Sequence, residues 1–71
     1  MNSLKAETEK LTILAALESA FDSDTPAAAR CCLQTALAST KRLAKAGRLT
    51  QDIELAVNET FAALRPRGWV S

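Results

Sequence analysis

Two short stretches, Thr25-Pro26 and Gly47-Arg48-Leu49-Thr50, divide this chain of 71 residues into three parts. Pro26 suits the first position of a helix, where no backbone amide is needed, and Asp24 or Thr25 can cap that helix. Gly47 can adopt the left-handed conformation that ends many helices, and Thr50 is a good N-cap for the next one. The two stretches therefore predict three helices, at about 4–21, 26–46 and 51–64.

Apolar residues recur at helical spacing in all three segments. In the first segment the main apolar stripe is predicted to be Leu4, Leu11, Leu14, Leu17 and Phe21, with Ile13 and Ala20 widening it. Many residues of the second stripe are small, which predicts a central helix: Ala29, Cys32 or Leu33, Ala36 or Leu37, Thr40, Leu43 and Ala44. The third stripe is Ile53, Val57, Phe61 and Leu64. Together these patterns indicate an all-α, three-helix bundle.

The ends of the outer helices are set by Ser3 and Pro66. The hydroxyl of Ser3 can accept an amide of the first turn, so we expect it to be the N-cap of the first helix. Because the residue before a proline avoids the helical conformation, the third helix should end at or before Arg65. The tail 66–71 is predicted to be non-helical.

The size of the chain predicts a single domain, 1–71, with a modest hydrophobic core. Such a core usually needs further stabilisation by a disulfide, a metal ion or oligomerisation. Cys31 and Cys32 are adjacent, and a disulfide between neighbours does not fit a regular helix. There is no histidine, so one chain cannot complete a four-ligand zinc site. Oligomerisation is the remaining way to stabilise the fold, and we therefore expect a homodimer.

The charge and hydropathy of the chain place it among soluble proteins. Its net charge of +1 is not that of a strongly basic, nucleic-acid-binding domain. Its first residues lack the apolar core of a signal peptide, and no apolar run approaches the roughly 20 residues of a membrane span. We expect a cytoplasmic protein that does not enter a membrane.

Catalytic residues are scarce in this sequence. Without His or Tyr, nucleophilic catalysis lacks its usual base. The glycines, Gly47 and Gly68, do not form a phosphate-binding loop. Burial would raise the pKa of a carboxyl group and suit it to acid–base catalysis. The carboxylates of this chain lie outside the apolar stripes and are therefore predicted to be exposed. The sequence therefore predicts no enzyme, no cofactor and no metal site.

Candidate partner-binding residues are Leu55, Arg65, Arg67 and Trp69. Leu55 lies off the main stripe of its helix, where it either completes a two-sided core or marks a self-association face. Arginine and tryptophan are enriched at protein interfaces. Trp69 has two possible roles: it folds back over the open end of the bundle, or it anchors a partner.

A basic cluster, Lys41, Arg42, Lys45 and Arg48, surrounds the end of the second helix. It complements the negative end of the helix dipole, and it is also a possible docking patch for an acidic partner. The second and third helices could form a helix-turn-helix, but Asp52 and Glu54 would then meet DNA phosphates. Cys31 is a possible redox thiol, although a reduced, structural cysteine pair is favoured.

The leading hypothesis is a non-enzymatic helical module that binds a protein partner, as a regulator or adaptor and as a homodimer. The alternative is a small nucleic-acid-binding regulator that uses the second and third helices.

Overall fold

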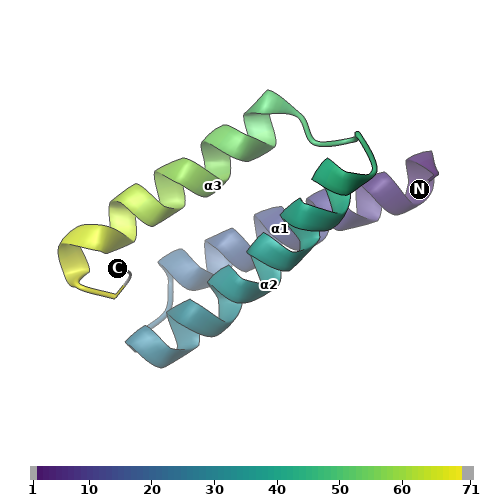
Figure 1. The fold of residues 1–71 in the computed structure, drawn as a ribbon. Coiled ribbons are helices and arrows are strands. Elements are labelled where there is room, and N and C mark those ends of the chain that lie inside the picture. Colours follow the sequence, from purple (N-terminus) through teal and green to yellow (C-terminus); the bar gives the residue numbers. More distant parts are fainter. Residues whose placement is uncertain (1, 70–71) are drawn as a thin grey trace.

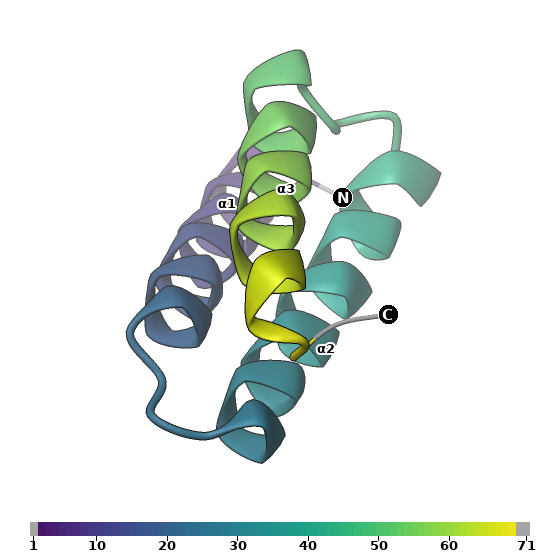
Figure 2. The ribbon, with the colours of Figure 1, turned by 90° about the vertical axis from the view of Figure 1, so that its left-hand side faces the viewer.

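The computed structural model describes residues 2–69 as three helices and a short 3-10 turn. The helices are α1 (Ser3–Phe21), α2 (Pro26–Lys45) and α3 (Gln51–Leu64), and the turn is η1 (Arg65–Arg67). The chain reverses its direction at each connection, so that α2 is antiparallel to both of its neighbours (Figures 1 and 2). The predicted all-α, three-helix bundle is confirmed, and each helix boundary lies within one residue of its predicted position.

Side chains cap the first two helices. The prediction of Ser3 as the N-cap of α1 is wrong by one residue, because Asn2 occupies that position and Ser3 is already helical. The Asn2 Oδ1 atom accepts a hydrogen bond from the Lys5 amide at 2.8 Å, which satisfies a first-turn donor. At α2 the predicted cap is confirmed, since Thr25 Oγ1 accepts from the Ala28 amide at 3.2 Å.

Gly47 ends α2 as the sequence predicts. Its φ of +71° lies in the left-handed region, where a side chain would be strained. The Arg48 amide donates to the Leu43 carbonyl oxygen at 2.8 Å, and this hydrogen bond closes the turn at the helix end. The connection reverses the chain and returns it as α3.

The tail differs from the prediction. α3 does end before Arg65, but Pro66 lies inside the 3-10 turn η1, so the beginning of the tail is helical. A proline fits there because its fixed φ suits the early positions of such a turn. Gly68, with a φ of +72°, ends η1. Val70 and Ser71 of the predicted tail lie outside the described residues.

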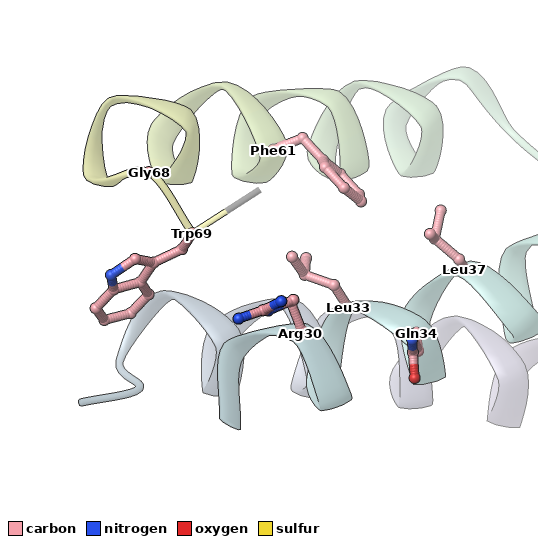
Figure 3. Close-up of a pocket in the computed structure, with 7 residues that line it drawn as sticks. All are labelled: Arg30, Leu33, Gln34, Leu37, Phe61, Gly68 and Trp69. Atoms are coloured by element: carbon pink, nitrogen blue, oxygen red, sulfur yellow. The ribbon is translucent and has the colours of Figure 1, made fainter. Parts of the chain in front are cut away.

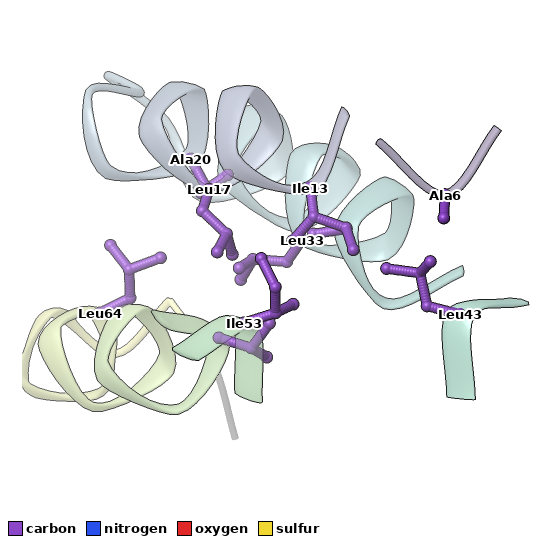
Figure 4. Packing of buried hydrophobic residues seen from close by; sticks show 11 residues of the cluster. Ala6, Ile13, Leu17, Ala20, Leu33, Leu43, Ile53 and Leu64 are labelled. Atoms are coloured by element: carbon purple, nitrogen blue, oxygen red, sulfur yellow. The ribbon is translucent and has the colours of Figure 1, made fainter. Parts of the chain in front are cut away.

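The core lies along the axis shared by the three helices (Figure 4). α1 and α2 form the most extensive contact, and α3 packs mainly against α1. The first two helices bury a set of small residues that lets the helix axes approach closely: Ala6, Ala20, Ala29, Ala36 and Ser39. α3 adds Ile53, Val57 and Leu64, as predicted, whereas Phe61 is half-buried.

The predicted core stripe of α1 is wrong at four of its five main residues, whereas Ile13 and Ala20, which were predicted to widen it, are buried. Of its main residues Leu17 is buried, while the other four are exposed: Leu4, Leu11, Leu14 and Phe21. The residues that α1 buries are Ala6, Ile13, Leu17 and Ala20. The physical reason is the close approach of α2, because alanines at two of these positions leave room for a neighbouring backbone and leucines do not.

Fewer residues of the predicted α2 stripe are fully buried than expected. Leu33 and Ala36 are buried, whereas their alternatives Cys32 and Leu37 are half-buried. Ala44 is exposed, because the core ends at Leu43. The fully buried Ser39 was not anticipated. Its Oγ accepts a hydrogen bond from Arg42 Nη2 at 2.9 Å, which satisfies the buried oxygen.

Candidate protein-interaction surface

Most of the large exposed apolar side chains lie on the outside of α1. Leu4, Leu11, Leu14 and Phe21 are 78%, 66%, 45% and 48% exposed. With the two glutamates between them they form what we call the outer row: Leu4, Glu7, Leu11, Leu14, Glu18 and Phe21. Its spacing alternates between three and four residues, which is the spacing of a seam that packs against another helix. α1 therefore has two apolar faces, of which the fold covers one.

The second half of the outer row borders a groove between α1 and α3 of about 480 Å³. Its apolar lining comes from both helices: Leu14, Leu17, Phe21, Ala56 and Ala63. Two exposed carboxylates, Glu18 on α1 and Glu59 on α3, also line it, and no Lys or Arg of the described chain does. The groove is thus apolar at its base and negatively charged at its edges.

A second groove, of about 320 Å³, lies between α2 and α3 (Figure 3). Phe61 points from α3 toward α2, where Leu33 and Leu37 face it, and Trp69 lies beside Arg30 at one end. Three of its lining side chains are half-buried and occupy part of the space between the helices: Leu37, Phe61 and Trp69. Its large apolar side chains are buried or half-buried, whereas Leu14 and Phe21 at the first groove are exposed.

The structure places Arg67 and Trp69 against the end of α1. Arg67 Nη1 donates to the carbonyl oxygen of Phe21 at 3.2 Å. Its guanidinium carbon lies 5.1 Å from the centre of the Phe21 ring and 5.3 Å from that of Trp69. Both separations are within the range of cation–π attraction. Of the two possible roles of Trp69, the structure therefore shows folding back over the bundle, where it packs against the core.

The four predicted partner-binding residues do not form one cluster. Arg67 and Trp69 contact each other, and Arg65 is exposed beside them on η1. Leu55 is 51% exposed on α3. A residue two positions away along a helix lies on the far side of it, so Leu55 points away from the buried Ile53 and Val57. Leu55 thus faces solvent and does not complete a two-sided core.

The basic cluster is partly engaged within the fold. Arg42 Nε forms an ion pair with Glu9 Oε2 at 3.1 Å and so links α2 to α1. Lys41, Lys45 and Arg48 are exposed and have no carboxylate within ion-pair distance among the described residues. This end of the bundle therefore presents these cations to solvent.

The start of α3 is negatively charged where a recognition helix would meet DNA. Asp52 and Glu54 are both exposed in its first turn. The neighbouring Thr50 side chain lowers the pKa of Asp52. Thr50 occupies the predicted N-cap position of α3, but its hydroxyl caps no amide of that helix. Exposed carboxylates are ionised at neutral pH, so Asp52 and Glu54 oppose contact with phosphate.

Neither cysteine is paired, and the two differ in exposure. Cys31 is exposed, as expected for a residue on the flank of α2, and Cys32 is half-buried. Within residues 2–69, no three Cys, Asp or Glu side chains gather closely enough to hold a metal ion. In the same part of the chain, no helix is both long and apolar enough to cross a membrane.

Comparisons of this chain with protein-family models, with curated proteins and with solved structures found no match.

Proposed function

We propose that this chain is a non-enzymatic protein–protein interaction module, a cytoplasmic regulator or adaptor that binds a helix of its partner along the outer row of α1. The observation that carries the proposal is that four large apolar side chains lie in one row outside a bundle that already has its own core. Contiguous exposed apolar surface of this kind is typical of interaction sites.

The geometry of the row favours a helical partner. Fully burying one exposed leucine is worth roughly 1.5–3 kcal/mol, whereas association costs about 4–15 kcal/mol in lost freedom. One or two contacts are therefore insufficient, and several side chains must be covered together. A helix lying along α1 covers the whole row at once, because its own side chains repeat at the same spacing.

The homodimer expected from the sequence is one form of this function, and binding to a different protein is the other. Nucleic-acid binding has less support, because Arg42 is engaged by Glu9 and the start of α3 is acidic. The glutamates of the outer row favour a different protein over a second copy of this chain.

Selection of helical peptides tests the proposed function. A displayed library of amphipathic helical peptides is selected on the full chain, and the selected peptides are then measured on the double variant Leu11→Asp/Leu14→Asp. Both leucines are exposed, so the variant should keep its helical circular dichroism. We expect binding to fall at least about tenfold. The control is Ala38→Asp on the exposed side of α2, which adds one negative charge away from the row and should bind normally.

Peptides that bind the Leu11→Asp/Leu14→Asp variant as tightly as the parent protein would show that the outer row is not the binding face. Equal losses in the Ala38→Asp control would point to a general effect of added negative charge, and would also count against the proposed site.

A further inference from the structure

We propose that the partner of the outer row is a basic amphipathic helix of another protein, whose lysines or arginines face Glu7 and Glu18. This inference rests on the proposed function and adds the chemistry of the partner. It is carried by the two glutamates, which lie between the leucines of the row at seam positions where a partner helix must meet them.

Both glutamates are available to a partner. Glu7 is exposed, and its cation partner within the described chain is Lys10, at 3.8 Å on the same helix. Glu18 is exposed and has no Lys or Arg within ion-pair distance among residues 2–69. Glu59 lies across the groove from Glu18 and adds negative charge at the same place. A helix entering this face therefore meets one carboxylate between Leu4 and Leu11 and another between Leu14 and Phe21. One cation, Arg67, lies at the Phe21 end of the row, where it is already engaged with the Phe21 ring and carbonyl oxygen.

The same charges disfavour a second copy of α1 as the partner. The row is nearly symmetric about its middle, so an antiparallel pair would place Leu11 against Leu14 of the other copy, and Leu4 against its Phe21. It would also place Glu7 against Glu18, twice in each dimer. A parallel pair would place each glutamate against its own copy. Like charges facing each other across an interface are costly, and they exclude partners that would otherwise fit.

The basic surface of α2 from a second copy does not supply the missing partner either. Lys41 and Lys45 are exposed on α2, but all five large exposed apolar residues of the described chain lie on α1 or α3. α2 would therefore bring positive charge without apolar side chains to cover the row. Such a contact would also join different surfaces of the two copies, and this type of contact tends to form open chains instead of closed dimers.

Two synthetic helical peptides test the partner chemistry on the full-length protein. Both carry leucines opposite Leu4, Leu11, Leu14 and Phe21 in the antiparallel register. One has lysines opposite Glu7 and Glu18, and the other has glutamates there. We expect the lysine peptide to bind about tenfold more tightly at low salt, because two attractive contacts replace two repulsive ones. The preference should shrink as salt screens the charges.

Charge reversal on the protein supplies the second arm. The variant Glu7→Lys/Glu18→Lys should prefer the glutamate peptide by a similar factor. The control Asp24→Lys/Glu54→Lys makes the same change of net charge at exposed positions outside the row, and it should keep the preference for the lysine peptide. A reversal confined to the first variant locates the selectivity at Glu7 and Glu18.

The outcomes separate this inference from the function on which it rests. If both peptides bind equally, and both lose binding in Leu11→Asp/Leu14→Asp, the row docks helices but does not select basic ones, and the inference is wrong. If neither peptide binds, both proposals fail. Selective, salt-sensitive binding of a DNA duplex in place of the peptides would overturn both as well.

Discussion

Arg67 joins the C-terminal turn η1 to the end of α1. It combines a hydrogen bond to the Phe21 carbonyl oxygen with contacts to the rings of Phe21 and Trp69. The planar guanidinium suits this position, because it can stack on a ring and donate a hydrogen bond at its edge. The last carbonyls of a helix have no partner within that helix, so Arg67 also completes the end of α1.

Arg67→Ala should destabilise the fold by about 1 kcal/mol, since it removes an exposed cation–π contact and a hydrogen bond from a charged donor. Urea unfolding followed by circular dichroism measures this change, and the fluorescence of Trp69 should shift to the red as the ring gains solvent. The control is Arg65→Ala, whose side chain is exposed on the same turn. If the two variants lose equal stability, the contacts of Arg67 contribute nothing specific.

Thr25 offers a second test at a single residue. Replacing a threonine N-cap by alanine typically costs about 1 kcal/mol, and Thr25 Oγ1 accepts the amide of Ala28 in α2. Thr25→Ala should therefore lower the urea midpoint by a corresponding amount. Thr35→Ala removes an exposed threonine from the middle of the same helix, where alanine is the better helix former. A loss of stability in Thr35→Ala as large as that in Thr25→Ala would contradict the capping role.

At the level of the helices, the sequence predicted where each begins and ends better than which face it buries. Thr25-Pro26 and Gly47 act locally, so their effect needs no knowledge of the neighbouring helices. The burial of α1 depends on how closely α2 approaches, and this distance is a property of the assembled pair. Ala6, Ile13 and Ala20 repeat every seven residues, as do Leu4 and Leu11. This double pattern was the signal that α1 has two apolar faces.

The contact between α1 and α2 makes a prediction about side-chain size. Ala36 is fully buried in α2, with small residues common among its buried neighbours. Ala36→Leu should overpack this contact and cost about 1–3 kcal/mol, as measured by thermal or urea unfolding. Ala38→Leu makes the same change on the exposed side of α2 and should be nearly neutral. A neutral result for Ala36→Leu would mean that the helices can separate without loss.

At the scale of the whole molecule, the candidate site arises from what the core leaves uncovered. The sequence led us to expect a homodimer, and it named Leu55 as a possible self-association face, while Leu11 and Leu14 were assigned to the core stripe. It could not separate the covered face of α1 from the uncovered one, because both have helical spacing. The intramolecular roles of Arg67 and Trp69 were likewise hidden, since they depend on the tail returning to the end of α1.

The near symmetry of the outer row leads to a prediction about oligomeric state. If facing glutamates are what keeps two copies apart, the chain should be monomeric at about 10–100 μM, and Glu18→Lys should create a dimer. In an antiparallel pair each introduced lysine would face Glu7 of the other copy, while the leucines keep their contacts. Opposite charges would then replace like charges at both ends of the seam. Sedimentation equilibrium measures the mass, and the new dimer should weaken with salt.

Glu54→Lys is the matched control, because it makes the same charge change on an exposed part of α3 and should remain monomeric. A dimer of the unmodified chain that dissociates in Leu11→Asp/Leu14→Asp would show that the row pairs with itself despite its charges. A monomeric Glu18→Lys would show that Leu4, Leu11, Leu14 and Phe21 do not form a continuous seam. Both results test whether Glu7 and Glu18 determine the partner of the outer row. If they do, the same two carboxylates must repel a second copy of α1 and attract a basic helix.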